Sequence, residues 1–139
     1  MNEKAIAYLN QNRMHHIDML ETIRRGFADV RYADDDGVLL YNRAGWVWML
    51  SAKTDAAFEK MCALIEDPML VETHQTKYMP AIRERFGLVG NMVCWQVAYL
   101  KKAPPDYPAP AGFDIRPLTP EYAAFVTEHY EQEHELSYL

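Results

Sequence analysis

The stretch FDIRPLTPEYAAFVTEHYEQEHELSYL, residues 113–139, indicates its own fold more directly than any other part of the chain. Pro117 restricts the residue before it to extended backbone, which predicts a short strand at residues 113–118. Thr119 is a favourable N-cap, and Pro120 fits the first position of a helix, where no backbone N–H is needed. The stretch therefore predicts one strand followed by one helix.

The helical part of this stretch has one apolar face. Tyr122, Phe125, Val126 and His129 recur at the i, i+3, i+4, i+7 spacing of an amphipathic helix. This spacing predicts that the face packs against other parts of the protein.

These residues resemble a known family. The run I-R-P-L-T-P-E-Y at residues 115–122, the aromatic pair Phe125 and Tyr130, and the closing Tyr138 and Leu139 are similar to the opening strand and first helix of GNAT-type N-acetyltransferases. The resemblance implies that this stretch begins a catalytic domain. It also implies an enzyme that moves acetyl from acetyl-CoA to an amine, either a small molecule or a protein N-terminus.

The same resemblance suggests which side chains meet the acceptor. The helix that begins at Pro120 would form part of the acceptor-binding wall, and Tyr130, His134 and Tyr138 would be the side chains nearest to it. The general acid and base usually come later in such chains, so no catalytic residue is assigned here.

The cofactor loop of that family is missing from this sequence. The family binds acetyl-CoA through a Q/R-x-x-G-x-G/A loop, whose backbone N–H groups face the pyrophosphate at the start of a helix. The nearest run here, R-F-G-L-V-G at residues 85–90, has the wrong spacing. The loop is expected beyond Leu139, so this chain is expected neither to bind acetyl-CoA nor to catalyse transfer alone.

Composition excludes several partners. The chain has 139 residues, 50% hydrophobic, and a net charge of −6 without a basic cluster, which argues against nucleic acid and anionic membranes. The polar N-terminus and the lack of an 18-residue apolar run predict a cytoplasmic protein. Cys62 and Cys94 form no zinc motif and are expected to be buried, inert thiols, so no metal is predicted.

Residues 1–103 predict an α/β (α+β) lobe with a mixed or antiparallel central sheet flanked by helices, similar to half of a GNAT domain. The expected order is helices at 2–10 and 12–26, three strands within 29–50, a helix at 54–66, a strand at 69–74, a helix within 77–86 and a strand at 92–100. The last is the most apolar, and Gln96, its one polar residue, is either a satisfied buried amide or a ligand contact.

A proline-rich run follows this lobe. The run APPDYPAPAG ends at Gly112 and cannot pair in a sheet, so it is expected to be a stiff linker. The predicted organisation is a lobe at 1–103, a linker at 104–112, and the start of a truncated GNAT-like domain at 113–139.

A second interpretation is a complete, non-catalytic α/β module that binds a ligand or forms a homodimer. Its basis is the missing cofactor loop together with Trp46, Trp48 and Trp95. The first two are expected on one face of a strand. His15 and His16 are expected to be surface side chains, and the His129 and His134 spacing does not fit a metalloprotease motif.

Overall fold

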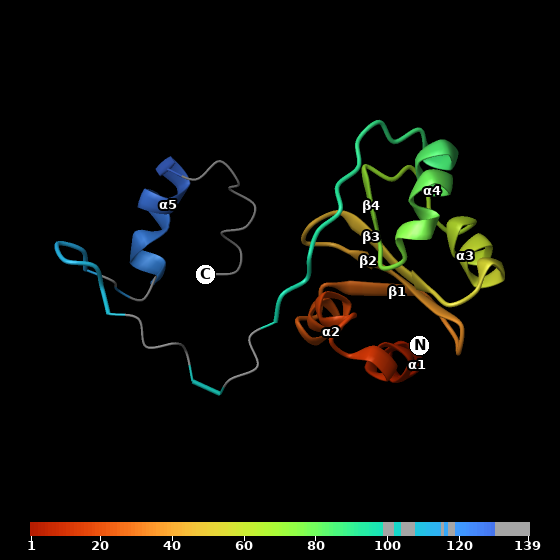
Figure 1. The fold of residues 1–139 in the computed structure, drawn as a ribbon, viewed down its shortest axis with the longest axis horizontal. Helices are drawn as coiled ribbons and strands as arrows, with labels where there is room; N and C mark the ends of the chain where they lie inside the picture. Colours follow the sequence, from red (N-terminus) through yellow and green to blue (C-terminus); the bar gives the residue numbers. More distant parts are fainter. Residues whose placement is uncertain (99–101, 104–107, 115, 117–118, 130–139) are drawn as a thin grey trace. The chain divides into compact units, whose positions relative to one another are not determined.

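The computed structural model describes residues 1–98, 102–103, 108–114, 116 and 119–129 (Figure 1). The chain divides into two compact units, Met1–Ala98 and Tyr99–Leu139. No helix in these described ranges is long and apolar enough to cross a bilayer.

The first unit contains one four-stranded sheet in the order β1-β2-β3-β4. Its first three strands pair antiparallel, and β4 pairs parallel to β3. This confirms an α/β fold with a mixed central sheet. The elements are α1 (Asn2–Leu9), α2 (Ile17–Arg24), β1 (Ala28–Ala33), β2 (Gly37–Asn42), β3 (Val47–Ala52), α3 (Asp55–Cys62), β4 (Leu70–Thr73) and α4 (Met79–Phe86), with 3-10 turns at Asn10–Asn12 and Thr76–Tyr78.

Helices cover both faces of this sheet, α1 and α2 on one and α3 and α4 on the other (Figure 1). Successive side chains of a strand point to opposite faces. In β3, Leu50 therefore packs with α3 and α4, while Met49 packs with α1 and α2. Most side chains of both layers are apolar, as expected where helices cover both faces of a sheet.

Local signals set most helix ends as expected. The Thr54 hydroxyl accepts a hydrogen bond from Ala57 N at 3.2 Å and caps α3. Gly87 ends α4 at φ 65°, a left-handed conformation that glycine adopts without steric cost. Residues 34–36 form the predicted turn between β1 and β2, and Gly37 is the first residue of β2.

The start of α2 differs from the prediction. The helix begins at Ile17 rather than after Asn12, and residues 13–16 form a turn. Asn12 holds this turn, because its carbonyl oxygen accepts from His15 N at 3.1 Å. The turn carries His16 into the core, so the expectation of two surface histidines is wrong for His16 and right for His15.

The predicted strand at residues 92–100 is a second correction. Residues 92–98 form no strand, and 99–100 lie outside the described residues. Trp95 is 93% exposed and Val97 is 89% exposed. Apolar composition indicates that a segment can form a strand, but a strand also needs a neighbouring edge to pair with. Cys94 is consequently exposed rather than buried, whereas Cys62 is buried as expected.

The second unit contains a 3-10 helix, Pro120–Tyr122, followed by α5, Ala123–His129. The helix thus begins after Thr119 as predicted, although no hydrogen-bond partner of the Thr119 hydroxyl is found among the described residues. Phe125 was expected on a packed face; it is 60% exposed and stacks on the His129 ring at 4.2 Å. No strand forms at residues 113, 114 and 116, and the other positions of that predicted strand lie outside the described residues.

Candidate functional site

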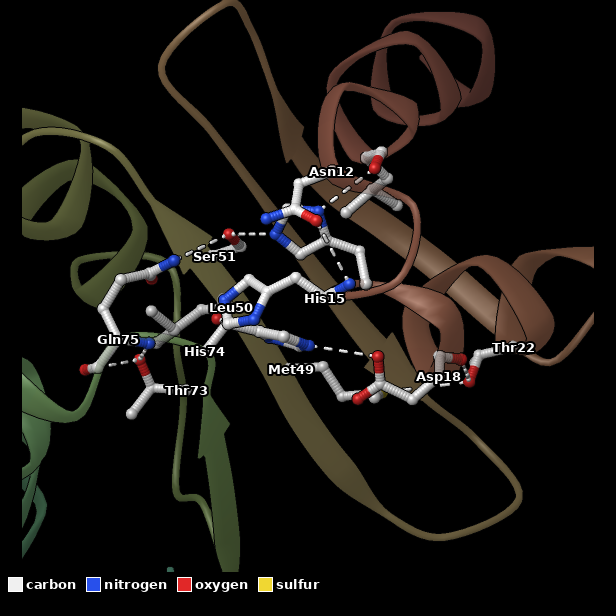
Figure 2. Close-up of polar contacts among 12 residues, drawn as sticks. Asn12, His15, Asp18, Thr22, Met49, Leu50, Ser51, Thr73, His74 and Gln75 are labelled. Carbon is white, nitrogen blue, oxygen red and sulfur yellow. Dashed lines mark hydrogen bonds and ion pairs between the residues drawn. The ribbon is translucent and has the colours of Figure 1, made fainter. Parts of the chain in front are cut away.

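Polar side chains gather on the α1 and α2 face of the sheet, near the carboxyl ends of β3 and β4 (Figure 2). In open sheets with parallel strands, ligands commonly bind beyond this end. Three stretches of the sequence, residues 8–18, residue 51 and residues 72–75, contribute to the cluster. Its members are Tyr8 from α1, His15 and His16 from the turn before α2, Asp18 from α2, Ser51 from β3, and Glu72, His74 and Gln75 from β4 and the residues after it.

One half of the cluster is a network around Ser51, which is fully buried. His16 Nδ1 lies 3.1 Å from the Leu9 carbonyl oxygen. Because a carbonyl can only accept, Nδ1 carries the proton of the neutral ring, and Nε2 accepts from the Ser51 hydroxyl at 2.9 Å. The Tyr8 hydroxyl and the Gln75 amide then donate to Ser51 Oγ, each at 3.1 Å. Burial lowers the pKa of His16 and favours this neutral form.

This geometry resembles an activated serine, in which a histidine accepts the hydroxyl proton and a third group orients the ring. Ser51 nevertheless has no exposed surface, and Tyr8 and Gln75 already engage its oxygen. A substrate carbonyl could not reach it. The network therefore joins α1, the turn at 13–16 and β3, and its role is structural.

The other half of the cluster contains Asp18, Glu72 and His74. One ligand atom from each lies within 4.8 Å of the other two. His74 Nε2 is 3.0 Å from Asp18 Oδ1, the contact drawn as a dashed line in Figure 2. Glu72 and His74 are two apart on an extended segment, so both point to the α2 face. Asp18 stands in the first turn of α2, where the helix dipole favours a carboxylate.

The two carboxyl groups have opposite tendencies to ionise. Burial, followed by the hydrogen bond and the charge of Asp18, raises the pKa of Glu72 to about 8. Burial also opposes ionisation of Asp18, but hydrogen bonds with His74, Glu72 and Gln96 outweigh it and lower the pKa of Asp18. Near neutral pH the pair therefore holds one proton, on Glu72.

Gln96, from the misassigned strand at residues 92–100, reaches this site. Its side chain is exposed and hydrogen-bonds the Asp18 carboxylate. Of the two interpretations for Gln96, a buried amide is therefore excluded. His15 borders the site as well, with its ring centroid 5.1 Å from that of His74.

The acceptor-wall residues Tyr130, His134 and Tyr138 lie outside the described residues. The tryptophans do not share one face. Trp48 belongs to the core, whereas Trp46 stands in the turn before β3 at φ 53° and is 58% exposed. The helix expected after Thr54 carries Cys62, where burial raises the pKa of the thiol to about 11, as expected of an inert cysteine.

Sequence reasoning missed the carboxylate and imidazole cluster because no motif joins positions 18, 72 and 74. Two weak signals were present. The pair Glu72 and His74 has the spacing that places two side chains on one face of a strand, and Gln96 interrupts an apolar run. Comparison with protein-family models, with curated proteins and with solved structures finds no match for this chain.

Proposed function

We propose that this chain is the N-terminal lobe of a GNAT-like acetyltransferase together with the start of its catalytic domain. The supporting observation is the order of elements. Residues 1–98 contain the two helices, three strands, helix, strand and helix expected of half of such a domain, without the strand that was expected after α4 at residues 92–98. The acceptor would be an amine, as a small molecule or a protein N-terminus, in the cytoplasm.

The lobe itself is proposed not to hold acetyl-CoA. The family presents free backbone N–H groups to the pyrophosphate at a helix that opens after a strand. The corresponding turn between β3 and α3, residues 52–54, contains no glycine. Thr54 Oγ1 already occupies the Ala57 N–H at the start of this helix. Acetyl-CoA would therefore have to bind elsewhere in the complete enzyme.

Calorimetry with acetyl-CoA tests the proposal that this chain does not hold the cofactor. The 139-residue chain is expected to show no binding in the micromolar range, and micromolar binding would overturn the proposal. The intact mass of the protein from its source cell is the complementary measurement. A mass well above 16.1 kDa, with a glycine loop in the additional sequence, is the result expected of an acetyltransferase.

A non-catalytic module that forms a homodimer is the second candidate, and one observation favours it. Apolar side chains after α4 are exposed, among them Val89 at 95% and Trp95 at 93%. Exposed apolar surface of this kind is typical of contact sites. A clean monomer in light scattering, with protease-sensitive chain after Gly112, would argue against this candidate.

A further inference from the structure

The Asp18, Glu72 and His74 side chains provide two carboxylates and one imidazole directed at a common point, from α2 and from the end of β4. The His74 side chain is only 6% exposed, and that of Asp18 is 25% exposed. Groups of this kind are costly to bury unless a cation or hydrogen bonds compensate them.

The surroundings of the His74 ring point to a cation between its Nε2 and the carboxylates. Nδ1 lies 3.4 Å from the Leu50 carbonyl oxygen, and Nε2 lies 3.0 Å from Asp18 Oδ1. Both neighbours are hydrogen-bond acceptors, but a neutral imidazole has only one N–H. With its proton on Nε2 the neutral ring donates to Asp18. With its proton on Nδ1, directed at the Leu50 carbonyl, the Nε2 lone pair is free for a metal ion between the ring and the carboxylates.

A metal ion would use this orientation of the ring. Histidines that bind metals usually donate their other N–H to a carbonyl or carboxylate, which directs the free lone pair at the ion. The Leu50 carbonyl stands in that position beside Nδ1. Gln96, through its hydrogen bond to Asp18, would orient one of the carboxylates in the same way.

We propose that Asp18, Glu72 and His74 bind one divalent first-row transition-metal ion, for which Zn²⁺ is the natural probe. Mixed nitrogen and oxygen ligands favour such an ion over Ca²⁺ and Mg²⁺, which prefer oxygen ligands alone. Zinc binds these atoms at about 2.0–2.2 Å, so the ligand atoms of a tetrahedral ion lie about 3.3–3.6 Å apart. His74 Nε2 and Asp18 Oδ1 are 3.0 Å apart, and all three ligand atoms lie within 4.8 Å of one another. Binding one ion therefore requires the most distant pair to approach by about 1 Å at most.

Three protein ligands leave one position of a tetrahedral ion open, as in sites where zinc holds water or a substrate. His15 and Gln96, both exposed, border the site. This inference goes beyond the acetyltransferase proposal and stands independently of it, because zinc binding and acetyl-CoA binding are separate measurements on the same chain.

Titration of the metal-free, 139-residue chain with ZnCl₂ by calorimetry tests the site, with Co²⁺ absorption as a second readout. We expect saturable binding of one ion per chain. Glu72→Gln and His74→Gln are each expected to weaken Zn²⁺ binding at least about tenfold, since even the loss of an outer hydrogen-bond partner costs about 10–100-fold. MgCl₂ and CaCl₂ are expected to give no saturable binding.

Two control variants separate this site from non-specific binding. Asp55→Asn removes an exposed carboxylate that pairs with Lys77 Nζ at 2.8 Å, and His129→Gln removes an exposed imidazole that does not belong to the cluster and stacks on Phe125. Both are expected to bind Zn²⁺ within about twofold of the native chain, because neither residue is assigned as a ligand. Circular dichroism in EDTA checks that each variant folds.

Several outcomes would overturn the proposal. One is the absence of saturable Zn²⁺ binding by the native chain. Another is native affinity in folded Glu72→Gln and His74→Gln. Loss of binding in His15→Gln with retention in Glu72→Gln would show a histidine site instead, and tighter binding of Mg²⁺ or Ca²⁺ than of Zn²⁺ would exclude the proposed class of metal.

Discussion

His74 Nε2 lies 3.0 Å from Asp18 Oδ1, although 56 positions separate the two residues in the sequence. The contact joins the first turn of α2 to the residue after β4. Glu72 reaches the same carboxylate, so the ionisation of each acid depends on the other and on His74. This coupling can be measured through the free energy of unfolding and its dependence on pH.

Glu72→Gln should make the metal-free chain more resistant to urea at pH 8, with a smaller gain near pH 5. The folded chain raises the pKa of Glu72 from 4.5 to about 8. The proton on such a group stabilises the fold fully below the unfolded pKa, and this stabilisation is lost as the pH rises through the folded pKa. The native chain therefore loses stability from about pH 4.5 to pH 8 through this group, and the neutral glutamine does not.

Urea unfolding of both chains in EDTA at the two pH values measures this difference. An equal change in free energy of unfolding between pH 5 and pH 8 for both chains would show that Glu72 does not keep its proton in the fold.

His16→Ala should destabilise the chain by about 1–3 kcal/mol for each buried group left without a partner. The variant deprives the Ser51 hydroxyl of its acceptor and the Leu9 carbonyl of its side-chain donor. His15→Ala, at the exposed neighbouring position, should change stability by no more than about 0.5 kcal/mol. Chemical denaturation at pH 7.5 gives both values, and equal effects would contradict the network.

The same histidine predicts a pH effect of opposite sign to that of Glu72. Burial lowers the pKa of His16 below its ordinary 6.5. Stability from a group with a lowered pKa is present above the unfolded value and declines as the pH falls below it. The native chain should therefore lose more stability than His16→Gln on acidification below pH 6.5. Parallel stability curves for the two chains would rule this out.

Gly37→Ala should cost about 1–3 kcal/mol, the usual effect of overpacking a filled site. A Cβ at this position would lie 2.9 Å from the Ser51 carbonyl oxygen and 2.9 Å from Met61 Cε. Met61 can move, but the carbonyl belongs to the backbone of β3. Gly45→Ala is the matched control, since its nearest contact is Val47 Cγ2 at 3.4 Å. The thermal unfolding midpoint of Gly37→Ala should therefore lie clearly below that of Gly45→Ala, and similar midpoints would contradict the close packing at Gly37.

Thr54→Ala should lower the free energy of unfolding by about 0.5–2 kcal/mol, because it removes the side-chain acceptor for Ala57 N at the start of α3. Thr54→Ser keeps that hydroxyl and should retain most of the stability. If serine and alanine proved equally destabilising, the hydrogen bond at this cap would not be the cause.

Residues that begin or end an element through local contacts could be predicted from the sequence. Examples are Thr54 before the apolar stripe of α3, Gly87 after α4, and the Asp36 and Gly37 pair where the turn between β1 and β2 ends. Each acts through its own backbone or through a neighbour within three residues. The wrong assignments arise where a local preference competes with another local structure or lacks a tertiary partner. The turn held by Asn12 displaced the first turn of α2, and residues 92–98 have strand-like composition without a ladder partner.

The sequence by itself determined the α/β class, the order of helices and strands through α4, and the turns between them, because these follow from period and capping within a few residues. Only the tertiary structure decided that β4 lies parallel to β3 and that α2 packs on the sheet face to which Glu72 and His74 point. Those long-range choices bring Asp18 to Glu72 and His74, and bury His16 against Ser51. Side chains without any shared motif become one site because helices that bury both sheet faces bring distant segments of the chain together.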